Sequence, residues 1–253
     1  MKYLMSLLAS SALMLGISSS AYAQTEVTLL APNPFKGSLD KVAPGFDGKT
    51  GYKLKLTYGR GLGTKEQAAR GEMFDVFIIL PPYPDALASG NIDPKSATTL
   101  ASLTLSLGVK KGAPKPDIST PNALKQALLA AETVAFVDPP MGSDGTATKE
   151  ALVKLGVWDQ VASKAKMAPN SAVVGNTVAK GDAEICIYWL NEMTNSGVDV
   201  VGRLPKQIST PLKVVAFVST HAKDAKGAKA LVAYLSSLEA EASYKKDGML
   251  PGR

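Results

Sequence analysis

Four polar side chains lie in glycine- or proline-rich segments, where side-chain and backbone donors can surround a small anion. Arg60 is flanked by glycines, and its guanidinium can form two parallel hydrogen bonds with one carboxylate. Asn33 offers an amide from a proline-rich turn. Ser143 and Asp144 precede a predicted helix whose first N–H groups are free to bind an anion. These residue types favour binding of a small anion over covalent chemistry.

Each of these residues also has a structural interpretation. Arg60 can be a solvated loop charge, and Asn33 can simply form the turn before Pro34. Ser143 or Asp144 can cap the helix that follows them. The residues alone leave both interpretations open.

Several kinds of catalytic or cofactor site are excluded by composition. The chain has one cysteine, Cys186, and one histidine, His221, so it has no disulfide framework and no Cys/His zinc site. We expect both residues to be structural, and we predict no metal and no cofactor. Gly59 to Gly63 has the spacing G-x-G-x-G, which differs from the dinucleotide-binding G-x-G-x-x-G.

The first 23 residues predict export. Met1-Lys2 is followed by an apolar run and then by Ala21-Tyr22-Ala23, which fits a signal-peptidase site, so we expect cleavage after Ala23. No later stretch approaches the ~20 apolar residues of a membrane-spanning helix. We therefore expect a periplasmic monomer that is not embedded in a membrane.

The positive charge first allows a nucleic acid, a membrane or a small anion as partner. The 253 residues contain 28 Lys+Arg and 22 Asp+Glu, a formal charge of +6. Export argues against a nucleic-acid partner, and the basic residues are scattered without interleaved aromatic residues. A small anionic ligand remains as the expected partner.

Hydrophobic periodicity predicts an α/β protein in which strands alternate with helices. Near-continuous apolar runs are typical of buried strands in a parallel sheet. We predict strands at 27–31, 53–58, 74–80, 134–137, 183–189 and 212–219, with helices at 39–46, 65–70, 147–155, 171–181 and 223–245. Because ligands in such folds bind beyond the carboxyl ends of strands, the segments 31–36, 59–64, 80–83, 139–146 and 188–191 are the candidate binding loops.

Three segments together resemble the periplasmic molybdate-binding proteins of ABC importers. The first is V-T-L-L-A-P-N-P-F, and the second is L-T-Y-G-R-G-L-G-T followed by A-R-G-E-M-F-D-V-F-I-I. The third is A-F-V-D-P-P with the later T-K-E-A-L-V-K-L-G-V-W-D, followed by V-A-K-G-D-A-E-I-C-I-Y-W. The resemblance implies a two-lobed periplasmic-binding-protein (Venus-flytrap) fold, with a mostly parallel sheet in each lobe and a two-strand hinge. It also implies a ligand in the interlobe cleft and an ABC transporter permease as partner. The expected division is lobe 1 at 24–105 and 210–253, and lobe 2 at 106–209.

The ligand-contact positions depart from that family. Pro34 stands where these proteins usually have a serine, and the second turn has no hydroxyl before Thr64. Proline removes an N–H donor, whereas Arg60 adds a cation suited to a carboxylate, so we expect an organic carboxylate rather than molybdate. Phe35, Trp189 and Tyr83 would add apolar walls. The expected ligand-binding residues are Asn33, Phe35, Arg60, Gly61, Ser143, Asp144, Tyr188 and Trp189.

Two functions compete on this scaffold. The first is a solute-binding protein that captures an organic (poly)carboxylate for an ABC importer. The second follows from a resemblance to the periplasmic aconitate isomerases, which move a proton and a double bond. That reaction needs a general base, for which Asp138, Asp144, a lysine or a tyrosine are candidates, and cations such as Arg60 with Lys36 or Lys65. A purely structural or adhesive role is disfavoured, because it would not need polar loops at five strand ends.

Overall fold

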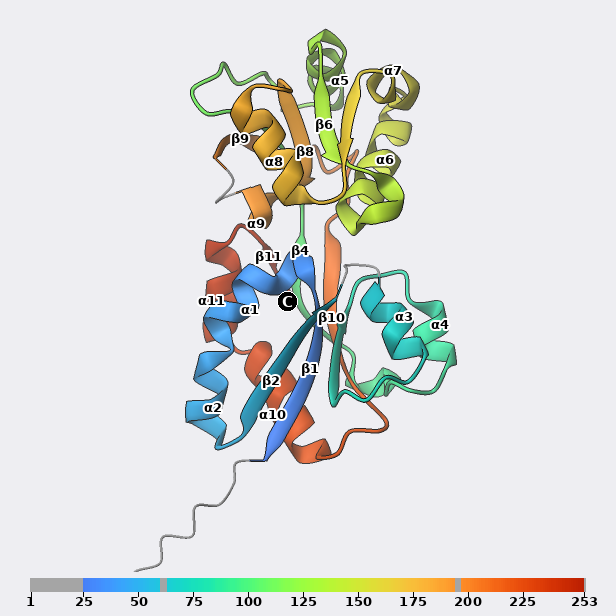
Figure 1. Cartoon of the computed structure of the whole chain (residues 1–253), viewed down its shortest axis with the longest axis vertical. Helices are drawn as coiled ribbons and strands as arrows, with labels where there is room; N and C mark the ends of the chain where they lie inside the picture. The colour runs from blue at the N-terminus through green and yellow to red at the C-terminus, as the bar shows by residue number, and fades with distance from the viewer. Residues whose placement is uncertain (1–24, 60–62, 194–196, 253) are drawn as a thin grey trace, which may run out of the picture.

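The computed structural model describes residues 25–59, 63–193 and 197–252. Two sheets, each flanked by helices, stand end to end along the long axis of the molecule (Figure 1). We call the half that contains the first sheet lobe 1 and the half that contains the second sheet lobe 2. The predicted two-lobed α/β fold is confirmed. The signal peptide, Arg60 and Gly61 lie outside the described residues.

Lobe 1 contains a six-stranded mixed sheet in the order β11-β4-β10-β3-β1-β2. The strands are β1 Glu26–Pro32, β2 Lys53–Gly59, β3 Val76–Ile79, β4 Thr98–Leu103, β10 Leu212–Val218 and β11 Leu250–Pro251. β1 is parallel to β2 and β3, whereas β10 is antiparallel to β3 and β4. The parallel part therefore carries β1, whose carboxyl end leads to Asn33.

Lobe 2 contains a five-stranded mixed sheet in the order β7-β6-β8-β5-β9. The strands are β5 Leu105–Lys110, β6 Val134–Val137, β7 Ala165–Ala168, β8 Ile185–Trp189 and β9 Val198–Arg203. β6 is parallel to β7 and β8, and β5 is antiparallel to β8 and β9. The expectation of mostly parallel sheets thus applies to three strands at one end of each sheet, β3-β1-β2 in lobe 1 and β7-β6-β8 in lobe 2, and antiparallel strands complete both sheets.

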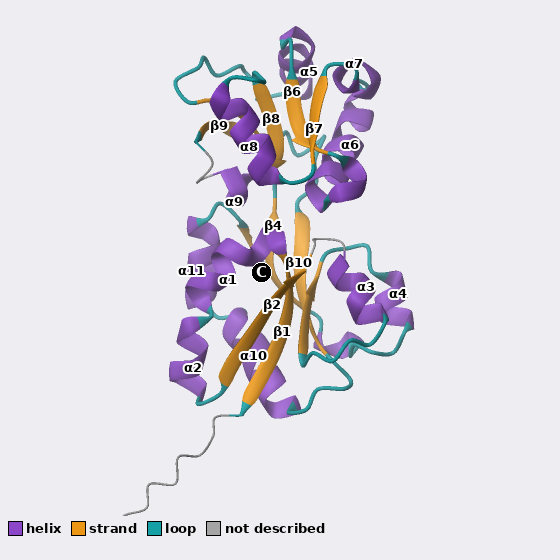
Figure 2. Ribbon diagram, in the orientation of Figure 1, coloured by secondary structure: helices purple, strands orange, loops and turns teal. Residues whose placement is uncertain are grey.

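Helices cover both faces of each sheet (Figure 2). In lobe 1, α1, α2, α10 and α11 lie on one side and α3 and α4 on the other (Figure 1). The helices are α1 Lys36–Val42, α2 Pro44–Thr50, α3 Gly63–Ala69, α4 Pro84–Ala88, α5 Pro121–Ala130, α6 Ser143–Leu155, α7 Trp158–Ala162, α8 Ser171–Lys180, α9 Leu190–Met193, α10 Ala225–Leu235 and α11 Leu238–Lys246. The 3-10 turns are η1 Asn33–Phe35, η2 Pro94–Ser96 and η3 Pro139–Met141.

Strand alternation sends neighbouring apolar side chains into different parts of the core. In β1, Leu29 packs into the cluster beneath α1 and α10, whereas Leu30 packs into the cluster on the α3 side. In β8, Trp189 and Tyr188 likewise belong to separate clusters. Both faces of these strands are therefore buried, which explains their continuous apolar sequences.

Three helix boundaries differ from the sequence prediction. The predicted helix 147–155 begins earlier, at Ser143, and Gly142 occupies its N-cap position. The predicted helix 39–46 is divided, because α1 ends at Val42 and Pro44 occupies the first turn of α2, where a missing N–H is tolerated. The predicted helix 223–245 is two helices, because the side chain of Ser237 accepts a hydrogen bond from Ala240 N and starts α11.

The chain passes between the lobes twice. Thr104 separates β4 from β5, and residues 204–211 connect β9 to β10. The two passages are joined, since Arg203 Nε donates a hydrogen bond of 3.2 Å to Thr104 Oγ1. This hydrogen bond holds the two connections together at the boundary between the lobes. It thereby helps to set how the strand-end loops of the two lobes face each other.

Candidate functional site

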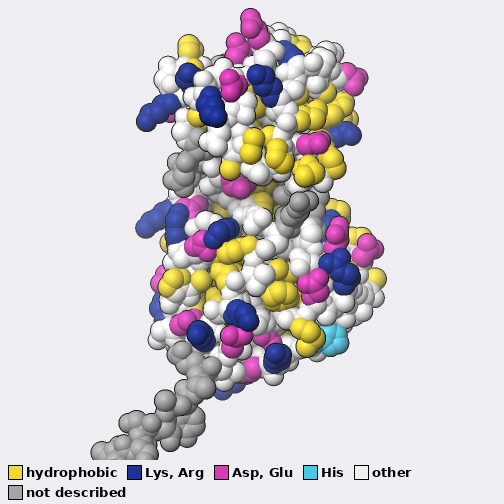
Figure 3. All heavy atoms as spheres, in the orientation of Figure 1, with side chains coloured by type: hydrophobic (Ala, Val, Ile, Leu, Met, Phe, Trp, Pro, Cys, Tyr) yellow, Lys and Arg dark blue, Asp and Glu magenta, His cyan; other side chains and the backbone are white. Residues whose placement is uncertain are grey.

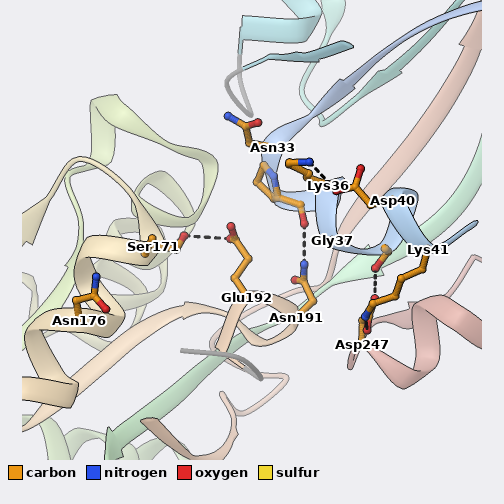
Figure 4. A pocket seen from close by; sticks show the side chains of 13 residues that line it. Asn33, Lys36, Gly37, Asp40, Lys41, Ser171, Asn176, Asn191, Glu192 and Asp247 are labelled. Carbon is orange, nitrogen blue, oxygen red and sulfur yellow. Dashed lines mark hydrogen bonds and ion pairs between the residues drawn. The ribbon is translucent and has the colours of Figure 1, made fainter. Parts of the chain in front are cut away.

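Two adjoining pockets, each with a volume of about 460 Å³, lie between the lobes. We call them together the interlobe cavity. Asn33, Pro34 and Lys36 of lobe 1 line both pockets, and so do three residues of lobe 2, namely Ser171, Ala172 and Glu192. Figure 4 shows these residues approaching one another from η1, α1, α8 and α9. The cavity therefore depends on both lobes for its walls.

The lobe 1 wall holds two lysines, and each is paired with a carboxylate: Lys36 with Asp40, and Lys41 with Asp247. Lys36 Nζ lies 2.6 Å from Asp40 Oδ2 and 4.5 Å from the centre of the Tyr58 ring. Tyr58 donates a further hydrogen bond of 2.6 Å to Asp40 Oδ1. The bonds from Lys36 and Tyr58 lower the pKa of Asp40, so this carboxylate stays ionised beside the cavity.

The lobe 2 wall holds two carboxyl groups that share one serine. Ser171 Oγ lies 2.8 Å from Asp144 Oδ2 and 3.0 Å from Glu192 Oε2. Asp144 is buried, with 4% of its surface exposed, and burial raises the pKa of its carboxyl group despite bonds from Ser171 and backbone N–H groups. We call Asp144, Ser171 and Glu192 the acidic cluster.

Glu192 keeps part of its surface open to the cavity, but its carboxyl group is set among protein atoms. Desolvation is the larger cause and the charge of Asp144 the next, and together they raise the pKa of Glu192 to about 8. A carboxyl group with a pKa near the working pH is suited to general acid–base chemistry.

Local structure explains how the acidic cluster is assembled. Asp144 lies in the first turn of α6 and Ser171 is the first residue of α8. Asn170 caps α8 by accepting a hydrogen bond of 3.0 Å from Val173 N. Glu192 is on α9, which directly follows β8. The cluster therefore joins two helix N-termini to the end of a central strand.

Three of the predicted ligand-binding residues line the cavity: Asn33, Ser143 and Asp144. Ser143 Oγ accepts a hydrogen bond of 3.2 Å from Trp189 Nε1, so the buried indole supports the first turn of α6. Asp144 faces Ser171 rather than capping the helix.

Three other predicted residues are buried in the core instead of forming cavity walls. Phe35 is fully buried and packs against Tyr244, with ring centroids 4.8 Å apart. Tyr188 is fully buried and Trp189 is 1% exposed. The expectation that Phe35, Tyr188 and Trp189 contact ligand is corrected accordingly, because their rings fill the space beneath the loops.

The remaining candidates lie elsewhere. Tyr83 packs on Phe217, and Lys65 donates a hydrogen bond of 2.7 Å to the Pro82 carbonyl. His221 contacts Asn91 on the outside of lobe 1, and Cys186 is buried in β8. None of these residues lines the interlobe cavity.

Ser171 and Glu192 lie outside the candidate loops predicted from the sequence, whereas Asn191 lies within the candidate loop 188–191. Glu192 lies three residues after the strand predicted at 183–189 and one position beyond the candidate loop 188–191, so the rule that ligands bind beyond strand ends could have identified it. Ser171 carries no such signal, because a serine at a helix start is usually only a cap.

Within residues 25–59, 63–193 and 197–252, no helix is long and apolar enough to cross a bilayer. Over the same ranges, no group of three or more His, Cys, Asp or Glu side chains is arranged to hold a metal ion. On the face drawn in Figure 3, lysine and arginine side chains are scattered among acidic ones and form no continuous patch.

Comparison with known proteins gives matches over almost the whole chain. Residues 27–250 match the family of bacterial extracellular solute-binding proteins. An aconitate isomerase of Pseudomonas sp. is 31% identical over 234 residues, covering 90% of this chain and 88% of that protein. A molybdate-binding protein of Azotobacter vinelandii is 26% identical, covering 92% and 93%.

Solved structures support the same fold. A substrate-binding domain of a putative molybdenum ABC transporter from Clostridium difficile superposes with a TM-score of 0.77 at 17% identity, covering 91% of this chain and 100% of that one. The Azotobacter vinelandii periplasmic molybdate-binding protein gives a TM-score of 0.72 at 20% identity, covering 90% and 100%. The resemblance to molybdate-binding proteins is thereby confirmed at the level of fold.

Proposed function

The chain belongs to the bacterial extracellular solute-binding proteins, and on this premise we propose that it binds a small organic polycarboxylate and shifts a proton within it. The reaction would be an isomerisation of the aconitate type. The observation that carries this proposal is the acidic cluster, in which two buried carboxyl groups share Ser171 in the wall of the interlobe cavity.

The chemistry of the cavity wall favours an organic acid over molybdate. Molybdate is a compact dianion whose whole charge would sit beside the carboxyl groups of Asp144 and Glu192, whereas an extended organic acid can hold its carboxylates away from them. An organic acid can place carboxylates near the amides of Asn33 and Asn176 and near Lys36, while its carbon chain contacts Met141. Each pocket, at about 460 Å³, is within the usual range for small-molecule sites.

The proposed reaction needs only proton transfer. A base removes a proton from a methylene carbon next to a carboxylate, the double bond moves by one position, and a proton returns at the former vinylic carbon. Glu192 faces both pockets, and its pKa of about 8 makes it a stronger base than an ordinary carboxylate. Lys36 lines both pockets, and its ammonium keeps two N–H donors for the ligand's carboxylates beside the one bonded to Asp40.

A second candidate function is capture of the same class of ligand for an ABC importer, without chemistry. The relatives that bind molybdate favour it, and so does a cavity whose walls come from both lobes. Closure of two lobes around a solute requires this arrangement. For either function we propose that residues 1–23 are a signal peptide that is cleaved after Ala23 and that the mature protein is periplasmic. For the capture function we also propose an ABC transporter permease as partner.

The test uses the mature chain from Gln24 onward. Purified protein is incubated with cis-aconitate and separately with trans-aconitate, and the isomer ratio is followed by ultraviolet absorption and chromatography. Calorimetry with citrate, the saturated acid tricarballylate and molybdate reports binding alone. Interconversion of the aconitates supports the isomerase. Carboxylate binding without interconversion supports capture, and tight binding of molybdate alone would contradict both.

A further inference from the structure

In the acidic cluster, Ser171 contacts two carboxyl groups, but when both are ionised its single proton can form a hydrogen bond with only one of them. Ser171 Oγ is within hydrogen-bond distance of both Asp144 Oδ2, at 2.8 Å, and Glu192 Oε2, at 3.0 Å. A serine hydroxyl carries one proton and can donate one such bond, but it can also accept bonds through its lone pairs. If both carboxyl groups are ionised, Ser171 donates its proton to one of them. The other contact then brings the lone pairs of two oxygens together with no proton between them.

The second contact becomes a hydrogen bond when one carboxyl group is protonated. That carboxyl group then donates to Ser171 Oγ, and Ser171 donates to the other, which stays ionised. The three oxygens are thus joined by two hydrogen bonds that use two protons, one from the serine and one extra.

Among the described residues, the charges around the cluster give no alternative way to hold two ionised carboxylates. Of the basic residues that line the cavity, Lys36 is paired with Asp40, and Lys41 is paired with Asp247. Within the described residues, no ion pair involves Asp144 or Glu192. Burial also raises the pKa of both carboxyl groups, in agreement with a retained proton.

We infer that Asp144, Ser171 and Glu192 hold one shared proton, and that Glu192, which lines both pockets, is the member that exchanges protons with the ligand. The exchange with ligand rests on the proposed function, whereas the shared proton rests on the geometry alone. Ser171 is then a positioning residue that links a deep carboxyl group to the one at the cavity.

The shared proton lets Glu192 act as a base and then as an acid. When the extra proton is on Asp144, the Glu192 carboxylate can take a proton from the ligand: a C–H bond breaks, an O–H bond forms, and the electron pair enters the allylic system. The O–H bond then breaks as a C–H bond forms at the other end of that system. The cluster returns to its starting state, and no other reactant is consumed.

Carbon-13 NMR titration of the mature chain, labelled at the Asp and Glu carboxyl carbons, tests the shared proton without any turnover. Asp144→Asn and Glu192→Gln assign the two signals. We expect the wild-type pair to titrate in two separate steps, one on each side of neutral pH. Titration of both groups together in the ordinary acidic range of exposed carboxylates would overturn the inference.

A matched pair of variants tests the role of Ser171. Ser171→Ala removes both hydrogen bonds of the singly protonated state, so the two steps should move toward each other by about 1 pH unit or more. Ser171→Thr keeps the hydroxyl and should leave the steps as far apart as in the wild type. Equal titration curves for the two variants would contradict the link through Ser171. Two separated steps in a protein that does not isomerise aconitate would remove the proposed function and leave the shared proton standing.

Discussion

The side chain of Asn191 donates a hydrogen bond of 2.6 Å to the carbonyl oxygen of Pro34, although the two residues are 157 positions apart in the chain. Asn191 belongs to α9 of lobe 2, and Pro34 belongs to η1 of lobe 1. Both residues line the cavity, and each is adjacent in sequence to another lining residue, Glu192 and Asn33 respectively. The bond therefore joins the lobes directly beside the acidic cluster.

Removing this bond should weaken ligand binding. In Asn191→Ala we expect the lobes to close less completely and the affinity for tricarballylate to fall by about 2- to 10-fold, as for a hydrogen bond of about 0.5–1.5 kcal/mol. Calorimetry gives the affinity, and small-angle scattering with and without ligand gives the degree of closure. Asn122→Ala, an exposed asparagine on α5, is the control. Unchanged affinity in Asn191→Ala would show that the bond does not contribute to closure.

Glu192→Gln keeps the size of the side chain but removes its ability to accept and return a proton. If Glu192 is the base, the rate of aconitate interconversion should fall by about 10²- to 10⁴-fold, which is the usual contribution of a general base. Steady-state rates in both directions provide the measurement. The matched control is Glu150→Gln, an exposed glutamate on α6. A variant that retained most of its rate would exclude Glu192 as the base.

The acidic cluster also predicts how stability depends on pH. Burial raises the pKa of Glu192 from 4.5 to about 8, so between these values the folded protein holds a proton that the unfolded chain has lost. Stability should therefore fall as pH rises through this window, and Asp144 acts in the same direction. Thermal unfolding of the ligand-free protein at several pH values should show this fall, and Glu192→Gln should flatten it. A wild-type midpoint that stays constant or rises across the window would contradict the protonated cluster.

Gly145 is required for close packing at the start of α6. A Cβ atom there would lie 2.4 Å from the carbonyl oxygen of Val137 and 2.8 Å from that of Asp138, and backbone atoms cannot easily move away. Gly145→Ala should thus destabilise the protein by about 1–3 kcal/mol and disturb Asp144. Gly48→Ala, in α2 with no atom within 4 Å of the new Cβ, should be neutral or slightly stabilising. Urea unfolding of both variants distinguishes these outcomes, and equal stabilities would count against the packing argument.

Much of the fold could be predicted from the sequence because its central strands are buried on both faces. The continuous apolar runs of β1 and β8 placed these strands within a residue or two of their observed bounds. Strands such as β7, with two exposed residues among four, lack that signal and were missed. The early start of α6 was missed because the run of Gly, Ser and Asp after Met141 resembles a loop.

The candidate site was predicted only in part, for two physical reasons. A large aromatic residue beside a binding loop can either face the ligand or support the loop, and Phe35 and Trp189 do the latter. The acidic cluster also joins residues from α6, α8 and α9, whose proximity depends on tertiary packing. Local sequence patterns carry no information about that proximity.

Proton exchange at the ligand's carbon tests the central claim most directly. Mature protein is mixed with trans-aconitate in D₂O, and proton NMR follows both the cis isomer and the loss of signal from the methylene carbon. We predict that wild-type protein produces the cis isomer with deuterium at the product's methylene carbon, which was the vinylic carbon of the substrate, and that Glu192→Gln produces neither the isomer nor the exchange while still binding aconitate. Bound aconitate with neither isomerisation nor exchange in the wild type would contradict a proton-transferring site and leave a protein that only captures its ligand.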